Sequence, residues 1–480
     1  MGTHSNKKQI FLHYRIMKRI ILTLLFIACT GAVVAQDSIY RMPRYLYLDM
    51  PLAELPYQQA AIGTTGGFIP SYMNPGMGFS LALSCDFYTA AHWGLSNISY
   101  SQNPRKQQQW SRLAIYGFDL VTSWMPFSNS WLHEEYHRAV MTLRGVNSFN
   151  EVLLCRIGST TISVSHETDE EMAMLCDQYH PDFIRLMSAG LEGQTLQNMR
   201  LQRDEFFYHH NLNHEVILLT NALNNTAYLA MCGWGWGDED TRVMNANEPT
   251  IAERDFTGMD LMAWAHALFN PETPYAMRGI HPSGLGIDRY ITTDDLSQEA
   301  IRYLRRQTLV DLINCISPLM IGIARFDLGQ RWGGQLYGNF ALRHYLTTFG
   351  DDNSVELLFQ LLRPAKHPLN GYLVLHNYNN YRHPFAGLEA GIVDLPVWDG
   401  RLLLSPNLHG WLQPEGFLTS KAQPGGSATL RMAANLRESD KLYSLCIPYV
   451  EVGYKTQGWM AGNVYLDATP YLNAGLRWRL

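Results

Sequence analysis

The sequence predicts an α+β protein: a helical domain followed by an antiparallel β-barrel of about eight strands. Residues 109–328 carry apolar side chains at the spacing of amphipathic helices, whereas residues 329–480 alternate apolar and polar side chains, as strands do. A basic and then apolar N-terminus indicates export. We therefore expect four parts: an N-terminal extension with a signal peptide (1–35), an irregular segment that could hold strands (36–108), a helical metal-binding domain (109–328) and the β domain (329–480).

The overall composition argues against a nucleic-acid partner. The formal net charge is -6, and no sustained basic run follows the first part of the chain. Charged residues make up only 17% of the chain and aromatic residues reach 12%. Few charges combined with many aromatic side chains suit a protein with much buried or lipid-facing surface.

The N-terminal leader has the order of a secretory signal. Met17-Lys18-Arg19 precedes an apolar run from Ile20 to Ala28, and small residues occupy the −3 and −1 positions of a cut after Ala35. We expect cleavage there and a location in the cell envelope. A membrane anchor is one alternative, but the run is short for a span. Lipid attachment at Cys29 is another.

The cysteines that follow the expected cut are even in number, which permits disulfides in an exported protein. None belongs to a C-x-x-C pair, so we do not expect a cysteine zinc site. They are Cys85, Cys155, Cys176, Cys232, Cys315 and Cys446.

Six segments of the middle region have helical periodicity or composition. Before them, prolines make the first part of 36–108 loop-like, and Phe79 to Tyr100 could hold one or two strands. The apolar end of the last segment carries Asp311 and Asn314 and is too short to cross a membrane, so we interpret it as a core helix. The six segments are Trp110 to Thr122, Ser130 to Arg144, Pro181 to Phe206, Leu212 to Met231, Thr257 to Phe269 and Leu296 to Ile323.

The C-terminal half alternates with a period of two. Its last strand places Leu472, Leu476 and Trp478 on one face and Asn473 and Arg477 on the other. Two interpretations remain. The half could be a transmembrane barrel with its apolar face in lipid, or a soluble sheet packed on the helical domain. The signal peptide, the aromatic content and the alternating terminal strand favour the barrel, and with it an outer-membrane location rather than the periplasm.

One motif carries chemistry: His133-Glu134-Glu135-Tyr136-His137. It lies in a segment that begins with a good N-cap, Ser130, and ends at Gly145, and its apolar residues form one stripe. We expect a helix of three to four turns. The stripe comprises Leu132, Tyr136, Ala139, Val140 and Leu143.

On such a helix His133 and His137 lie one turn apart on the same side, so both imidazoles can bind one zinc ion. Glu134 follows the first histidine and lies beside the site. A carboxylate there can act as the general base that takes a proton from zinc-bound water. The alternative is a pair of solvent-facing histidines on a surface helix.

This motif resembles that of the HExxH zincins, a broad class of zinc metallopeptidases. The resemblance covers the motif and one later helix. The three-histidine subclass is excluded because Leu143 stands where its third histidine would be. What remains resembles the gluzincin type, which implies a third ligand from a downstream glutamate. Glu192 is the best candidate, because Gly190 and Gly193 would let its helix approach closely.

The sequence therefore predicts an exported zinc metallopeptidase acting on a peptide or protein substrate. The motif itself fits other hydrolyses, so the peptidase activity rests on the resemblance. The main alternative is a non-enzymatic outer-membrane protein for transport, assembly or adhesion, with the helical region as plug or scaffold. A third is a glycan- or peptide-binding module, suggested by Trp234 and Trp236.

Overall fold

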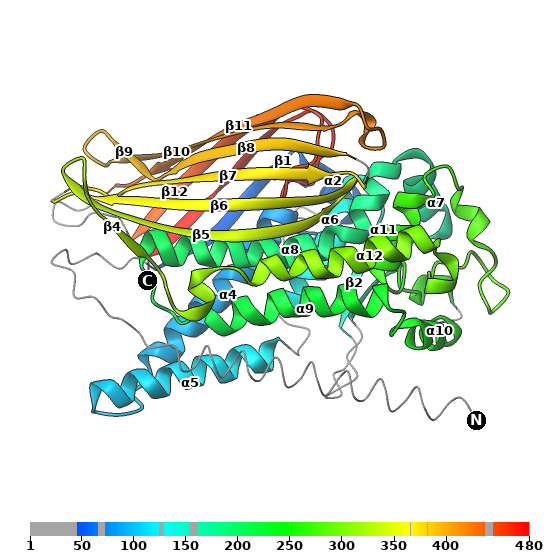
Figure 1. Cartoon of the computed structure of the whole chain (residues 1–480), viewed down its shortest axis with the longest axis horizontal. Coiled ribbons are helices and arrows are strands. Elements are labelled where there is room, and N and C mark those ends of the chain that lie inside the picture. Colours follow the sequence, from blue (N-terminus) through cyan, green and yellow to red (C-terminus); the bar gives the residue numbers. More distant parts are fainter. Residues whose placement is uncertain are drawn as a thin grey trace.

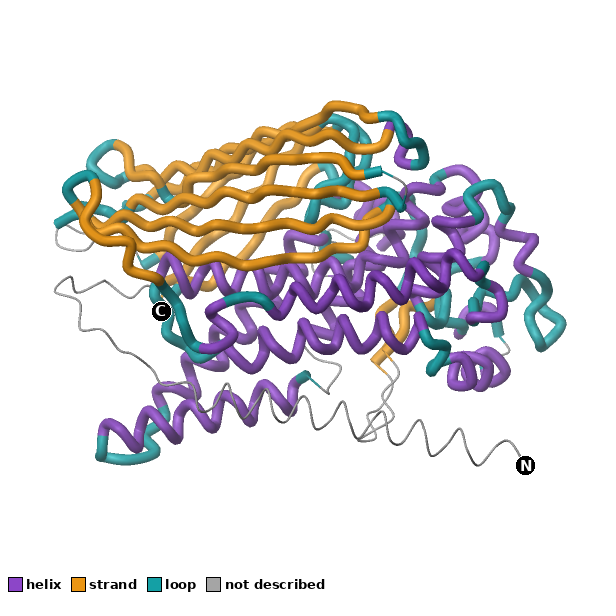
Figure 2. Tube along the Cα trace, in the orientation of Figure 1, coloured by secondary structure: helices purple, strands orange, loops and turns teal. Residues whose placement is uncertain are grey.

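A computed structural model of the chain describes residues 46–65, 73–123, 129–152, 162–248, 250–364, 366–381, 383–436 and 445–479. A large, strongly curved antiparallel sheet arches over a layer of helices (Figure 1). Coloured by secondary structure, the chain separates into these two layers, with loops gathered at the ends of the strands (Figure 2). The expected signal peptide, Cys29 and Cys155 lie outside the described residues.

The described helices are α2 (Tyr57–Thr65), α4 (Met77–Asn97), α5 (Pro104–Thr122), α6 (Asn129–Leu143), α7 (Asp169–Gln178), α8 (His180–Tyr208), α9 (Glu215–Gly233), α10 (Asp238–Asn247), α11 (Asp260–Phe269) and α12 (Gln298–Asp311). Short 3-10 turns follow α12, at Leu312–Cys315 and Pro318–Ile321. The strands are β1 (Tyr47–Leu55), β2 (Phe149–Val152), β3 (Ile162–Ser165), β4 (Phe326–Arg331), β5 (Gly334–Thr347), β6 (Gly350–Leu362), β7 (Leu369–Asn379), β8 (Pro384–Val393), β9 (Leu395–Val397), β10 (Leu402–Pro414), β11 (Ala422–Ala434), β12 (Cys446–Lys455) and β13 (Thr469–Arg479).

All six segments predicted from periodicity contain helices, and the last of them continues beyond Asp311 as short 3-10 turns. The strands expected within Phe79 to Tyr100 are wrong: residues 79–97 of this segment belong to α4. It is apolar on most sides, so it has no helical stripe that would distinguish it from buried strands. The expected loop before it instead contains β1 and α2.

The closed barrel of about eight strands is also wrong. The large sheet has 11 strands in the order β1-β13-β12-β11-β10-β8-β7-β6-β5-β4, with β9 paired to β10. β1 and β4 are its two edges and do not pair with each other. Helix α4 packs against β1, and the 3-10 turns after α12 pack against β5, so helices cover the opening between the edges.

Helix α8 fills the concave side of the sheet. Arg200 of α8 bonds Asp49 of β1 at 2.7 Å, and Arg203 of α8 bonds Glu356 of β6 at 2.6 Å. Because β1 and β6 lie towards opposite ends of the strand order, one helix can reach both only if the sheet curves around it. The buried charges on this side are paired, as burial of ions requires.

The two faces of the sheet have opposite polarity. The concave face is lined by polar and charged side chains that are buried or half-buried: Asp49, Arg343, Asp352, Glu356, Gln360, His376, Glu389, Asn407, His409, Gln413, Lys455 and Arg477. The convex face exposes large apolar side chains: Met50, Leu52, Phe359, Leu375, Leu388, Ile392, Leu408, Leu412, Val450, Val452, Tyr454, Leu472 and Trp478. The concave face also contributes Leu358, Leu403 and Ile447, which pack against the end of α8.

The largest apolar core is centred where α6, α8 and α11 meet, and it extends to Tyr345, Tyr378 and Trp411 of the sheet. Helix α5 lies on the far side of the helical layer from the sheet (Figure 1). Among the described helices none combines the length and hydrophobicity that crossing a membrane requires. The cysteines within the described residues are all free thiols, at positions 85, 176, 232, 315 and 446.

Candidate metal centre

Helix α6 carries the motif, and its predicted stripe is buried: Leu132, Tyr136, Ala139 and Val140 are inaccessible to solvent, and Leu143 packs against the same core. Gly145 ends the helix as expected. Its φ of 78° lies in the left-handed region, and its amide donates to the carbonyl of Thr142 at 3.0 Å.

The close approach of α8 to α6 depends on two glycines. A Cβ atom added to Gly190 would lie 2.3 Å from Nε2 of His133, and one added to Gly193 would lie 2.9 Å from Cγ of Tyr136. The expectation that these glycines bring α8 against the motif helix is confirmed.

His133 and His137 converge on one carboxylate, that of Asp260. Nε2 of His133 lies 3.1 Å from Oδ2 of Asp260, and Nε2 of His137 lies 3.4 Å from the same oxygen. All three side chains are largely shielded from solvent, with side-chain exposures of 12%, 1% and 8%. The alternative, a pair of solvent-facing histidines on a surface helix, is thus not what the fold forms.

The other ring nitrogen of each histidine is bonded away from this point. Nδ1 of His137 donates to the carbonyl oxygen of Leu186 at 2.5 Å, and Nδ1 of His133 lies 3.4 Å from Oε1 of Gln194. A carbonyl oxygen only accepts, so Nδ1 of His137 carries the proton and its Nε2 presents a lone pair in the neutral ring. Two such lone pairs facing a carboxylate require a cation between them, either a proton on the rings or a metal ion.

The histidines and Asp260 shift one another's pKa values. Burial opposes protonation of His137, but the charge and hydrogen bond of Asp260 hold its pKa above the ordinary value. Burial alone would raise the pKa of Asp260, yet His137 and His133 hold that pKa below its usual range. The site therefore stabilises a carboxylate beside positive charge, which is also what a divalent ion would supply.

Asp260 is the first residue of α11, and the loop before it is fixed by polar contacts. Oδ1 of Asp255 accepts from the amides of Thr257 at 3.0 Å and Gly258 at 2.7 Å. The amide of Asp260 donates to the hydroxyl of Tyr228 at 2.9 Å. These contacts hold the carboxylate of Asp260 at the N-terminus of α11, where it faces the two histidines.

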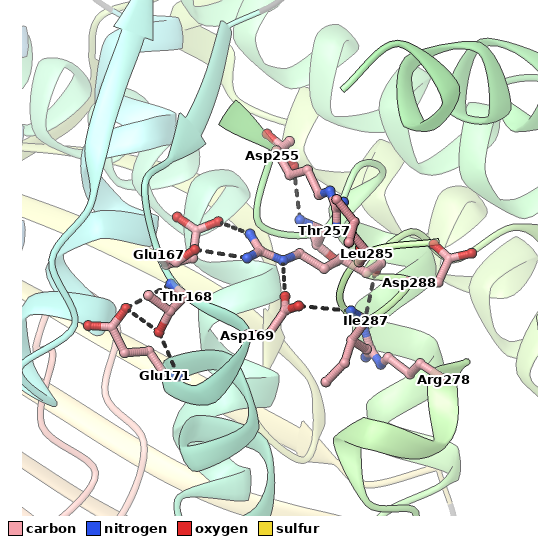
Figure 3. A network of polar contacts seen from close by, with 12 residues as sticks. Glu167, Thr168, Asp169, Glu171, Asp255, Thr257, Arg278, Leu285, Ile287 and Asp288 are labelled. Carbon is pink, nitrogen blue, oxygen red and sulfur yellow. Dashed lines mark hydrogen bonds and ion pairs between the residues drawn. The ribbon is translucent and has the colours of Figure 1, made fainter. Parts of the chain in front are cut away.

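A buried ion network supports the same region (Figure 3). Arg289 donates to Oε1 of Glu167 at 2.6 Å and to Oδ1 of Asp169 at 2.9 Å, and the amide of Ile287 donates to Asp169 at 2.8 Å. Figure 3 shows Glu167 and Asp169 reaching from the start of α7 towards the loop that contains Ile287, with Asp255 and Thr257 close by. The network ties the loops around α11 to the helical core.

Glu134, the expected general base, is half-buried on α6 beside the histidine pair. Burial raises the pKa of its carboxyl well above the ordinary value, and the negative charges of Asp260 and Asp255 raise it further. Glu134 therefore lies close enough to Asp260 and Asp255 for their negative charges to act on its carboxyl group.

The structure does not bring Glu192, the expected third ligand, to the histidines. Its carboxylate accepts from Arg185 at 2.8 Å and from the amide of Gly462 at 2.7 Å. Around these histidines, the potential ligands that lie within 4.8 Å of one another are His133, His137 and Asp260. Asp260 thus occupies the place assigned to Glu192, and an aspartate at the start of a predicted helix gave no sequence signal beyond that of an N-terminal helix residue.

His210 and His214 are buried near Tyr208 and His92 and do not join the group around Asp260. Trp234 and Trp236 stack on each other with ring centroids 5.9 Å apart and are partly exposed.

No family model matches the chain, and neither a curated protein nor a solved structure is significantly similar to it.

Proposed function

We propose that the protein is a zinc-dependent hydrolase, with His133, His137 and Asp260 as metal ligands and Glu134 as general base. One observation carries the proposal: the Nε2 atoms of both histidines point at one carboxylate oxygen, 3.1 and 3.4 Å away, while Nδ1 of each is directed to an oxygen acceptor elsewhere. Two imidazoles and one carboxylate are a ligand set that catalytic zinc sites use, and they leave a coordination position free.

When bound, zinc acts as a Lewis acid that acidifies water and polarises a carbonyl group. The residues of the chain then have separate tasks. Leu186 and Gln194 orient the two rings, and Tyr228 and Asp255 hold the start of α11. Glu134, next to His133 in the motif, is the group that would take up a proton at its carboxylate.

We further propose that the reaction is peptide hydrolysis, which makes the substrate a peptide or protein. This step rests on the resemblance of His133-Glu134-Glu135-Tyr136-His137 to the zincin motif. Glu192, expected as the third ligand of a gluzincin-type site, is replaced by a carboxylate from another helix, so only the kind of ligand is retained.

Metal analysis tests the site. Wild type purified without chelator is expected to hold zinc, and His133→Ala and Asp260→Asn are expected to lose the zinc ion bound at this site. His266→Ala is the matched control, because His266 lies on α11 with Asp260 but outside the ligand group. A wild-type protein that takes up no zinc on titration would overturn the proposal.

Glu134→Gln then tests the base. It is expected to keep zinc and to lose hydrolysis of a casein or peptide-library substrate by a factor of about 10² or more. Unchanged hydrolysis by this variant would remove Glu134 from the mechanism while leaving the metal site intact.

We propose that the sheet places the protein in the outer membrane, with its convex face in contact with lipid chains. Support comes from the polarity of the sheet: on β8 and β10, exposed Leu388 and Leu408 alternate with Glu389 and His409 on the concave side. Leu408→Arg would place a charge in lipid, which costs about 2–4 kcal/mol near the bilayer centre. We expect it to impair insertion into phosphatidylcholine vesicles, whereas Leu309→Arg on α12 should insert normally. Equal insertion of both would contradict the lipid contact.

A non-enzymatic role remains the alternative, and one observation favours it: α8 fills the concave side of the sheet as a plug would. The metal analysis separates the two functions. A zinc-free protein that inserts into vesicles would fit the alternative and not the hydrolase.

A further inference from the structure

We propose that the concave face of the sheet holds a second divalent transition-metal site, formed by His376 of β7, Glu389 of β8 and His409 of β10. These three residues offer ligand atoms within 4.8 Å of one another. They share no helix or strand with the site around Asp260. The inference is independent of the proposed hydrolase.

The strand register builds this cluster. His409 lies directly opposite Glu389 in the β8–β10 ladder, and both point to the concave side. His376 comes from the next strand, opposite Gly387. Its ring stacks on that of His409 with centroids 4.7 Å apart, and its Nε2 lies 3.7 Å from Oε2 of Glu389.

Each ligand is oriented by a neighbour that bonds its other polar atom. Nδ1 of His376 donates to Asp352 at 2.8 Å, which directs Nε2 into the cluster. Nε2 of His409 lies 2.9 Å from the hydroxyl of Tyr378, which directs Nδ1 inward. Oε1 of Glu389 accepts from Asn407 at 2.7 Å, which leaves Oε2 for the centre. Carboxylate–histidine pairs of this kind orient metal-binding imidazoles.

One buried atom of the cluster, Nδ1 of His409, lacks a hydrogen-bond partner, and Nε2 of His376 faces the carboxylate of Glu389 at 3.7 Å. His409 is only 4% exposed, so bulk water does not satisfy it. A buried nitrogen lone pair without a partner costs free energy, and a metal ion shared with Glu389 would offset that cost. Two imidazole nitrogens and one carboxylate oxygen favour zinc or a similar late transition metal over calcium or magnesium.

A glycine gives this cluster its room. A Cβ atom on Gly387 would lie 2.6 Å from the ring of Tyr378 and 3.2 Å from Cβ of His376. Tyr378 in turn positions His409. The glycine therefore lets both aromatic side chains pack where the two ligands meet.

The place of the site in the sheet suggests a structural role. The ladder between β8 and β10 runs only from Asn407 to Trp411, and the pair of His409 with Glu389 lies at its centre. A metal ion bound there would cross-link three neighbouring strands at a short ladder. Since binding needs the folded geometry, its free energy would add to that of folding.

Zinc equilibrium dialysis with mass-spectrometric metal counting tests the site on the full-length protein. We compare wild type, His133→Ala, His409→Ala and the double variant, with His383→Ala as control because that exposed histidine lies beside β8 but outside the cluster. The expected contents are about two zinc ions per chain in wild type and control, one in each single variant and none in the double variant.

The outcomes separate the two sites. Loss of zinc from His409→Ala but not from His133→Ala supports the strand site and overturns the zinc hydrolase. A His133→Ala protein that binds no zinc overturns the strand site, even if His409→Ala does not fold. As a second readout, zinc should raise the thermal midpoint of His133→Ala, and no rise would also count against it.

Discussion

Gly190→Ala is expected to uncouple zinc binding from folding stability. The added Cβ would lie 2.3 Å from Nε2 and 2.4 Å from Cδ2 and Cε1 of His133. The ring must move by roughly 1 Å to reach an ordinary contact distance. Zinc–nitrogen bonds of about 2.0–2.1 Å tolerate deviations of about 0.2 Å, so the displaced ring can no longer serve as a ligand.

The stability of the fold should change far less. Alanine is favoured over glycine in a helix by about 1 kcal/mol, and overpacking typically costs about 1–3 kcal/mol, so the two effects partly cancel. Zinc affinity should fall by about 100-fold or more, which corresponds to about 2.7 kcal/mol.

Zinc titration followed by isothermal calorimetry measures the affinity, and urea unfolding of the metal-free protein measures the stability. Gly94→Ala on α4 is the matched control: it is also a helical glycine, and its added Cβ would meet nothing within 4 Å. It should keep zinc and gain up to about 1 kcal/mol. Wild-type zinc affinity in Gly190→Ala would refute the role assigned to His133 and to the approach of α8.

Three further predictions concern the surroundings of the site. Arg289→Ala leaves two buried carboxylates without their partner and should lower the free energy of unfolding by about 3–5 kcal/mol in urea, whereas exposed Arg242→Ala should change it by less than about 1 kcal/mol. Tyr228→Phe removes the acceptor for the amide of Asp260 and should weaken zinc binding by about tenfold with kcat/KM falling in parallel; unchanged affinity would contradict this positioning role. Burial lowers the pKa of His266 to about 4, so the unfolded chain binds a proton there before the folded protein does. Stability should fall from about pH 6.5 to 4 by at most ~1.4 kcal/mol per pH unit, and His266→Gln should flatten that slope.

The sequence was sufficient for elements whose pattern is periodic. Amphipathic stripes located α5, α6 and α8, and alternation located the strands of the C-terminal half. Pairing over long sequence separation was not accessible in this way. β1 pairs with β13, although almost the whole chain separates the two strands in sequence. Nothing in the nine residues of β1 predicts that pairing. The sheet is therefore larger than predicted, and its edge strands β1 and β4 do not pair with each other.

Glu192 lies away from the two histidines for a geometric reason that the sequence does contain. Residues of an α-helix turn by about 100° each, so Glu192 points about 200° away from Gly190. If Gly190 and Gly193 mark the face of α8 that touches α6, Glu192 must lie on the opposite side, together with Arg185. Asp260, in contrast, is 123 positions from His137, and only folding of the loop before α11 brings it to the site.

Glu192→Gln puts this division of α8 into two faces to a direct test. Glu192 and Arg185 are fully buried side chains in an ion pair of 2.8 Å, and Glu192 also accepts from Gly462, in the connection between β12 and β13. Loss of the negative charge leaves Arg185 buried without its partner, which costs about 3–5 kcal/mol. Unfolding in urea should show that loss, while the folded variant should hold as much zinc as wild type. A variant of wild-type stability that has lost its zinc would instead return Glu192 to the ligand set and remove Asp260 from it.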